Sequence, residues 1–196
     1  MSIQSFARWA LGSMVIAEGV AAWSRFDARS RLFLEAARRA QSLQRTLVVI
    51  GDPDAGASTR LLRAYDCGEV CVDAKGCPMC PVMKVADITA GPIPGIPSNS
   101  AVVFVSCVLE YVGDLPAALR EILRIAGELD NIYIVTVQPW TLTASLYPGA
   151  RWAGIADRHV VAMARVTTAH KAIAAGVVAG ASLLALWPSG RKEEDQ

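Results

Sequence analysis

From Thr46 onwards the chain consists of short apolar runs that alternate with helical segments and loops. Apolar runs without a regular polar alternation are typical of strands that are buried on both faces. When such strands alternate with helices, they indicate a parallel sheet wound by right-handed crossovers. The pattern therefore predicts a doubly wound, mostly parallel α/β sheet, with strands at Thr46–Ile50, Glu69–Asp73, Met83–Ile88, Ala101–Ser106 and Asn131–Val137.

The segments between and after these strands are assigned by the same reasoning. Ala57–Tyr65 has a helical composition, and Leu115–Ile125 has a clear helical period. The proline-rich segment Pro92–Ser100 predicts a loop. Leu142–Ala156 has no strong pattern, and Arg158–Val166 predicts one more strand, which could be an antiparallel edge.

The N-terminal part of the chain predicts two helices, Phe6–Trp23 and Ser24–Arg45. The chain is 53% hydrophobic with a mean hydropathy of +0.35, so lipid or another chain is expected to cover part of its surface. Within the first helix, Arg8 and Glu18 each oppose membrane insertion by roughly 2.5–3.5 kcal/mol. This helix is therefore expected to lie at a membrane interface or against a partner.

The C-terminal segment Ala172–Trp187 carries no charge over sixteen residues. As a helix it would be about 24 Å long, which is shorter than the roughly 30 Å hydrocarbon core of a bilayer. Gly176 and Gly180 form a G-x-x-x-G pair that allows a second helix to approach closely. The segment is thus expected either to anchor the chain in a membrane or to pack on a partner or on the N-terminal helix.

These observations predict one α/β domain at residues 46–168, with apolar helical extensions at residues 1–45 and 169–196. The arginines of Ser24–Arg45 either meet anionic lipid or nucleic acid, or form a solvated basic face. The formal net charge of +1 does not itself indicate a nucleic-acid partner. Because the N-terminus lacks a basic start, we expect no cleaved signal peptide and an intracellular protein that is bound to a membrane or to a larger assembly.

Residues 46–140 resemble the class I S-adenosylmethionine-dependent methyltransferase family. The resemblance rests on VADIT (Val85–Thr89), on AVVFVSCVLEYVGDLPAALREILRIAG (Ala101–Gly127) and on NIYIVTVQP (Asn131–Pro139). It implies a Rossmann-like sheet that binds S-adenosylmethionine at the carboxyl ends of its strands.

The resemblance also implies positions for a cofactor site. By position, Asp73 would hold the ribose hydroxyls and Asp87 would lie beside the adenine. Asp52 and Asp54 also suit an ordinary turn, and Asp73 also suits the end of a strand. The sequence indicates neither a catalytic residue nor a methyl acceptor. The candidate cofactor-binding residues are Gly51, Asp52, Gly56, Asp73, Asp87, Ser106 and Cys107.

Two functions from different classes follow from this pattern. The first is a small S-adenosylmethionine-dependent methyltransferase that is held at a membrane or in a complex by its apolar ends. The second is a catalytically inactive protein of the same fold that serves as a structural or assembly subunit, for example of a membrane complex or a virion. Val49 and Pro53 favour the second, because they replace the acidic residue and a glycine that the family usually has around the first turn.

Four of the five cysteines lie within fourteen residues, at Cys67, Cys71, Cys77 and Cys80. Their thiolates could form a tetrahedral zinc site, with C-x-x-C supplying two ligands from one turn. They could instead form disulfides, for example within Cys77–Cys80, or remain free thiols. A zinc-binding or redox module is therefore a third function to consider.

Overall fold

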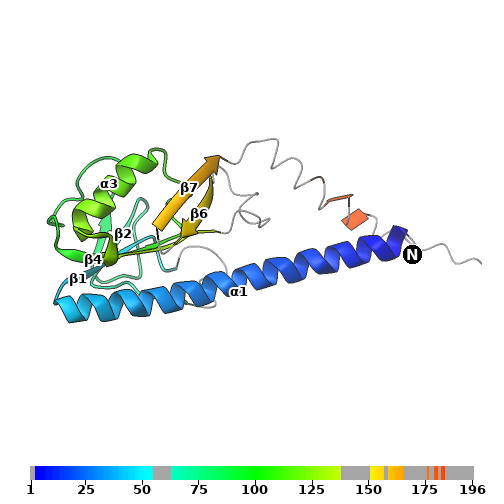
Figure 1. Ribbon diagram of the computed structural model, residues 1–196, viewed down its shortest axis with the longest axis horizontal. Helices are drawn as coiled ribbons and strands as arrows, with labels where there is room; N and C mark the ends of the chain where they lie inside the picture. Colours follow the sequence, from blue (N-terminus) through cyan, green and yellow to red (C-terminus); the bar gives the residue numbers. More distant parts are fainter. Residues whose placement is uncertain are drawn as a thin grey trace, which may run out of the picture.

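The computed structural model describes residues 3–54, 63–137, 151–156 and 159–165, together with a few single helical positions between residues 176 and 183. Its main body is a parallel sheet with a helix on each face, and one of these two helices is long and extends well beyond the sheet (Figure 1). Residues 57–62 of the predicted helix Ala57–Tyr65 lie outside the described residues, as does most of the C-terminal segment, and the remaining three residues up to Tyr65 are not helical.

The central sheet has five strands, all parallel, in the order β3-β2-β1-β4-β5. From β1 the chain moves outwards through β2 and β3, then returns to place β4 on the other side of β1. The point where the direction reverses lies between β1 and β4, as in a Rossmann-like fold. The predicted parallel sheet is thus confirmed. Its strands are β1 (Thr46–Ile50), β2 (Val70–Asp73), β3 (Met83–Val85), β4 (Ala101–Ser106) and β5 (Ile132–Val135).

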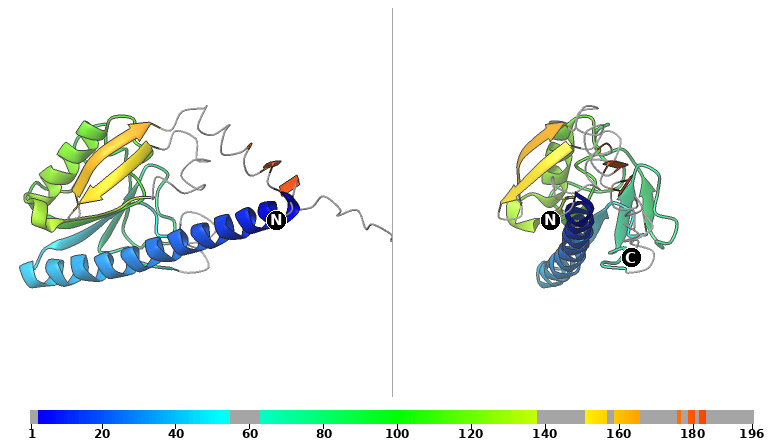
Figure 2. Two further views of the ribbon diagram at one scale, coloured as in Figure 1. Left: turned by 45° about the vertical axis from the view of Figure 1, so that its right-hand side comes forward. Right: turned by 90° about the vertical axis from the view of Figure 1, so that its right-hand side faces the viewer.

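The strands are apolar on both sides because helices cover both faces of the sheet. Every residue of β4 is buried. One set of alternate side chains, including Val103 and Val105, packs with Ile122 and Ile125 of α3 (Leu115–Ala126). The other set, including Val102 and Phe104, packs against the long helix α1 and the cysteine loop. Figure 2 shows the two helices on opposite sides of the sheet.

Helix α1 (Ile3–Leu43) is one continuous helix, so the prediction of two separate helices is wrong. The stretch from Val20 to Leu43 contains neither glycine nor proline, and Ser24 alone does not stop a helix. The C-terminal half packs on β1, β4 and β5, and the N-terminal half extends beyond the sheet (Figure 1). Among the described residues, no helix combines the length and the hydrophobicity that crossing a membrane requires.

Helix α3 has a well-defined cap at each end. Asp114 accepts a hydrogen bond from the backbone N–H of Ala117 at 2.9 Å, and Pro116 lies in the first turn. Gly127 ends the helix with a φ of 77° and donates to the carbonyl of Leu123. A short 3-10 helix, η1 (Leu129–Asn131), then leads into β5.

The strands β6 (Arg151–Ala156) and β7 (His159–Arg165) form an antiparallel pair that is separate from the parallel sheet. The predicted strand Arg158–Val166 is confirmed as β7. Strand β6 was not predicted, because its sequence RWAGIA is rich in alanine and glycine, which have low strand propensity.

Candidate functional site

The carboxyl ends of β1 and β4 meet where the strand order reverses, and ligands of open α/β sheets bind outside that position. Ile50 and Val105 are neighbours in the register, so Gly51 lies beside Ser106, the last residue of β4. Gly51 has a φ of 107°, and a Cβ atom there would lie 2.7 Å from the carbonyl oxygen of Ser106. Only glycine therefore allows β1 to end this close to β4.

Helix α1 contributes a guanidinium to this edge. Arg29 Nη2 donates a hydrogen bond to Cys107 Sγ at 2.8 Å, although the two residues are 78 positions apart in the sequence. Cys107 follows β4 with a φ of 53°, and its backbone N–H donates to the carbonyl of Val135 in β5. Burial raises the pKa of the Cys107 thiol to about 11, so the group is a neutral thiol near pH 7 and a poor nucleophile.

Glu110 is the buried acid of the site. It is only 1% exposed, and its Oε1 accepts a hydrogen bond from the backbone N–H of Val137 at 2.5 Å. Burial raises the pKa of this carboxyl to about 7, because the charged form loses its hydration. The carboxyl therefore exchanges a proton near neutral pH and ties the segment after β4 to the end of β5.

Within the part of the chain that the structure describes, three buried polar atoms of this edge have no hydrogen-bond partner: Arg29 Nε, Ser106 Oγ and Glu110 Oε2. The Ser106 hydroxyl lies near that of Tyr65, and Glu110 lies near the Cys107 thiol. Buried polar atoms normally find a protein or water partner, since leaving one unpaired costs about 1–3 kcal/mol. Three such atoms around one strand end are what a polar ligand or bound water would satisfy.

The turn after β1 is held by its own side chains. Asp52 Oδ1 accepts from the backbone N–H of Asp54 at 3.0 Å, and the Tyr65 hydroxyl donates to the Asp52 carbonyl at 3.2 Å. Burial raises the pKa of Tyr65 to about 12, so this hydroxyl keeps its proton. The predicted site residue Gly56 lies outside the described residues.

The two aspartates predicted for ribose and adenine lie at the carboxyl ends of the neighbouring strands. Asp73 is the last residue of β2, and its Oδ1 accepts from the backbone N–H of Lys75 at 2.8 Å. Asp87 follows β3, and bonds from the N–H and hydroxyl of Thr89 hold the pKa of this carboxyl below its usual range. Each carboxylate thus closes a turn with one of its oxygens.

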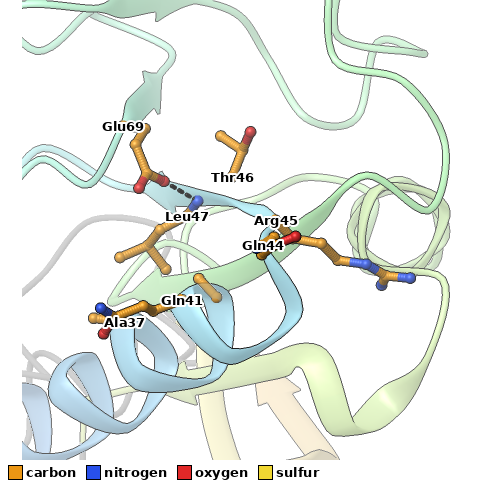
Figure 3. A pocket seen from close by; sticks show the side chains of 8 residues that line it. Ala37, Gln41, Gln44, Arg45, Thr46, Leu47 and Glu69 are labelled. Carbon is orange, nitrogen blue, oxygen red and sulfur yellow. Dashed lines mark hydrogen bonds between the residues drawn. The ribbon is translucent and has the colours of Figure 1, made fainter.

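Two shallow hollows on the described surface can be compared with the predicted site. The larger, about 690 Å³, lies at the opposite, amino end of β1, where Glu69 accepts a hydrogen bond from the backbone N–H of Leu47 (Figure 3). The smaller, about 300 Å³, lies between the segment Ile88–Pro92 and α3, directly after Asp87. The larger hollow contains none of the predicted site residues, whereas the smaller one borders the edge where Asp87 lies.

The four clustered cysteines lie on the α1 face of the sheet and are all buried. They form the disulfides Cys67–Cys80 and Cys71–Cys77, so the suggested pairing of Cys77 with Cys80 is wrong. The backbone N–H of Cys80 bonds the carbonyl of Cys77 in a tight turn, and both side chains reach cysteines that precede this turn. The sulfurs of Cys71, Cys77 and Cys80 lie within 4.8 Å of one another, so the same cluster could hold a metal ion.

Comparison with known protein families, with characterised proteins and with solved structures finds no match. The site residues therefore have to be judged on geometry alone. Sequence reasoning missed Arg29, Tyr65 and Glu110. A usable signal existed for two of them: Arg29 shares a helix face with Leu32 and Ala36, and Glu110 interrupts an apolar run.

Proposed function

We propose that the domain binds S-adenosylmethionine at the carboxyl edge of its parallel sheet and acts as a methyltransferase-like protein. The observation that carries this proposal is the set of unpartnered buried atoms of Arg29, Ser106 and Glu110 at the point where the strand order reverses. The amino-acid part of the cofactor carries a carboxylate and an ammonium group. A guanidinium and a carboxyl are the protein groups that complement these two charges.

The neighbouring strand ends supply the remaining contacts in this proposal. Asp73 would accept hydrogen bonds from the ribose hydroxyls, and Asp87 would lie beside the adenine, next to the hollow at Ile88–Pro92. Gly51 and Asp52 would line the turn at the sulfonium end. When bound, the cofactor supplies an electrophilic methyl group, and the chain's own residues bind and orient it.

Isothermal titration of the reduced protein with S-adenosylmethionine tests this proposal. The variant Asp73→Asn keeps an oxygen for the Lys75 N–H but loses the charge. It should weaken binding roughly ten- to hundredfold, because hydrogen bonds to a charged group contribute about 1.5–3 kcal/mol. Asp130→Asn is the matched control, since Asp130 is an exposed carboxylate in η1 at the opposite edge. Folded protein that releases no heat at submillimolar cofactor would refute the proposal.

A second candidate is the catalytically inactive structural or assembly subunit. It is favoured by the way the chain occupies its own edge, with Arg29 on Cys107 and Tyr65 on the Asp52 carbonyl. In this case the unpartnered atoms would be satisfied by water. The same titration separates the two candidates. If the chain is an inactive subunit, the wild-type protein releases no heat with S-adenosylmethionine, and Asp73→Asn does not differ from the Asp130→Asn control.

Both candidates place the apolar ends of the chain against a membrane surface or other protein subunits. Large apolar side chains on the N-terminal half of α1 support this part of the proposal, since Phe6, Trp9, Ile16, Val20 and Trp23 are all well exposed. We expect lipid or other chains to co-purify with the full-length protein. After truncation of residues 1–24 this co-purification should be lost.

For the cysteine cluster we propose zinc as the bound ion in the reduced protein. The sulfurs of Cys71, Cys77 and Cys80 already lie close enough to share one ion, and Cys67, which is bonded to Cys80 in the oxidised form, would be the fourth ligand of a closed tetrahedral zinc site. Disulfide formation and zinc binding exclude each other, because a sulfur in a disulfide carries no thiolate charge. A filled site would hold the segment between β2 and β3 on the α1 face of the sheet.

Metal analysis of reduced, zinc-dialysed protein tests this assignment. We expect one zinc ion per chain in the wild type and none in Cys77→Ser. Cys107→Ser is the matched control and should retain the ion, because Cys107 lies at the end of β4 and is bound to Arg29. Reduced, folded wild type without zinc would show that these cysteines act only as disulfides or thiols.

A further inference from the structure

The N-terminal half of α1 exposes a row of large apolar side chains. Phe6, Trp9, Ile16, Val20 and Trp23 are each between 58% and 71% exposed. Figure 1 shows this half of the helix extending beyond the parallel sheet. Side chains of this size are rarely left in water as a group, so an interaction surface is indicated.

These five residues lie on one narrow stripe of the helix. Together with Ser13 they recur at alternating intervals of three and four residues, which is the a/d pattern of a heptad repeat. Ala7 and Ala21 lie off this stripe and are buried. We call the stripe of Phe6, Trp9, Ser13, Ile16, Val20 and Trp23 the α1 seam.

The residues beside the seam favour a helix as its partner. Ala10, Gly12, Ala17 and Gly19 flank it with small, uncharged side chains. A Cβ atom placed on Gly12 or Gly19 would meet no atom within 4 Å, so a second backbone has room to approach. A helix that lies on a bilayer usually has a strongly basic polar face. The arginines of this chain instead lie mostly beyond Trp23.

We propose that the α1 seam binds the same seam of a second copy of this chain in an antiparallel helix pair. Two antiparallel copies match residue by residue. Phe6 faces Trp23 of the partner subunit, Trp9 faces Val20 of the partner subunit, and Ser13 faces Ile16 of the partner subunit. In the two central layers Ser13 of one chain meets Ile16 of the other, and a small side chain opposite a branched one allows the two helices to interdigitate. This inference is independent of the cofactor and zinc proposals.

The position that follows the seam explains why the pair is antiparallel. Asp27 takes the next place in the repeat after Trp23. In a parallel pair the two Asp27 carboxylates would face each other, and like charges oppose association. In the antiparallel pair each Asp27 lies beyond the end of the other seam and remains in water. The two α/β domains then lie at opposite ends of the helix pair.

Sedimentation velocity of the full-length protein tests the association. The wild type should be a dimer at micromolar concentration. Ile16→Asp should raise the dissociation constant by roughly a hundredfold or more, because each chain would bury an unpaired carboxylate. Val15→Asp is the matched control: Val15 is 70% exposed but lies off the seam, so this variant should remain dimeric.

Cysteine crosslinking in a Cys107→Ser background tests the orientation. A mixture of Ser13→Cys and Ile16→Cys chains should form a crosslinked heterodimer under mild oxidation, and Ser13→Cys alone should crosslink much less. Preferential Ser13→Cys homodimers would refute the antiparallel order. A monomeric wild type would overturn the proposal. If that monomer also sediments with lipid vesicles, and Ile16→Asp loses this binding, the α1 seam is a bilayer-binding surface instead.

Discussion

Replacing Glu110 by glutamine should stabilise the folded protein at alkaline pH and change its stability little in mild acid. Glu110 is buried, and its hydrogen bond from the Val137 N–H can be kept by the amide oxygen of glutamine. The substitution therefore removes the ionisable proton while preserving shape and the backbone contact.

The sign and magnitude follow from the pKa of the carboxyl. It is about 7 in the folded protein against 4.5 for the unperturbed group, so the folded state holds the proton more tightly. The stability from this group is fully present below about pH 4.5 and is lost as the pH rises through about 7. A shift of this size corresponds to a loss of about 3 kcal/mol in the free energy of unfolding.

Urea denaturation at several pH values between 5 and 8, with the cysteines in the same redox state, measures this effect. The free energy of unfolding of Glu110→Gln minus that of the wild type should grow with pH over this range. Glu128→Gln is the control, because Glu128 is exposed and solvent screens its charge. A difference for Glu110→Gln that stays constant with pH, or that shrinks as the pH rises, would refute the reasoning.

Substitutions at three further positions test the close approach of β1 to β4, the cap of α3 and the core by chemical denaturation. Gly51→Ala should destabilise the protein by about 1–3 kcal/mol, because its Cβ would collide with the Ser106 carbonyl in a backbone region that disfavours side chains; an unchanged midpoint would contradict this close approach. Asp114→Ala should cost about 0.5–2 kcal/mol through loss of the α3 cap, whereas Asp114→Asn should retain most of it. Phe104→Ala should cost about 3–5 kcal/mol, because Phe104 is fully buried in contact with Phe33 and Tyr65; a loss below 1 kcal/mol would argue against that core.

Several elements could be predicted because their signal is local. Strands β1 and β4 have the bounds expected from their uninterrupted apolar runs, and α3 differs from its prediction by one residue. Strands β3 and β5 end earlier than predicted, because an apolar residue beyond the end of a strand, such as Ile88 or Val137, looks the same in the sequence as one inside it. Strand β2 begins one residue later than predicted, at Val70. The sequence predicts two helices in place of α1 because the segment before Ser24 is mostly apolar and the segment after it is rich in arginine. This change in composition does not stop the helical backbone.

The candidate site was predicted only in part. The positions of Gly51, Asp73, Asp87, Ser106 and Cys107 at strand ends follow from the order of the strands along the chain, since parallel strands share one carboxyl edge. Asp73 and Asp87 bond residues two positions later, in turns that are local to the sequence. The partner of the Cys107 thiol does not follow from the sequence, because it depends on how α1 packs against the sheet.

The amino-acid sequence by itself determined the class of this fold, because strands buried on both faces and separated by helical segments leave few arrangements other than a parallel α/β sheet. It also determined that the cysteines cluster and that α1 is apolar near its start. Only the tertiary structure decided that Arg29 reaches Cys107, that Glu110 is buried against the end of β5, and that Cys67 pairs with Cys80. These contacts join residues from 13 to 78 positions apart, and their geometry depends on the packing of whole elements rather than on any local preference.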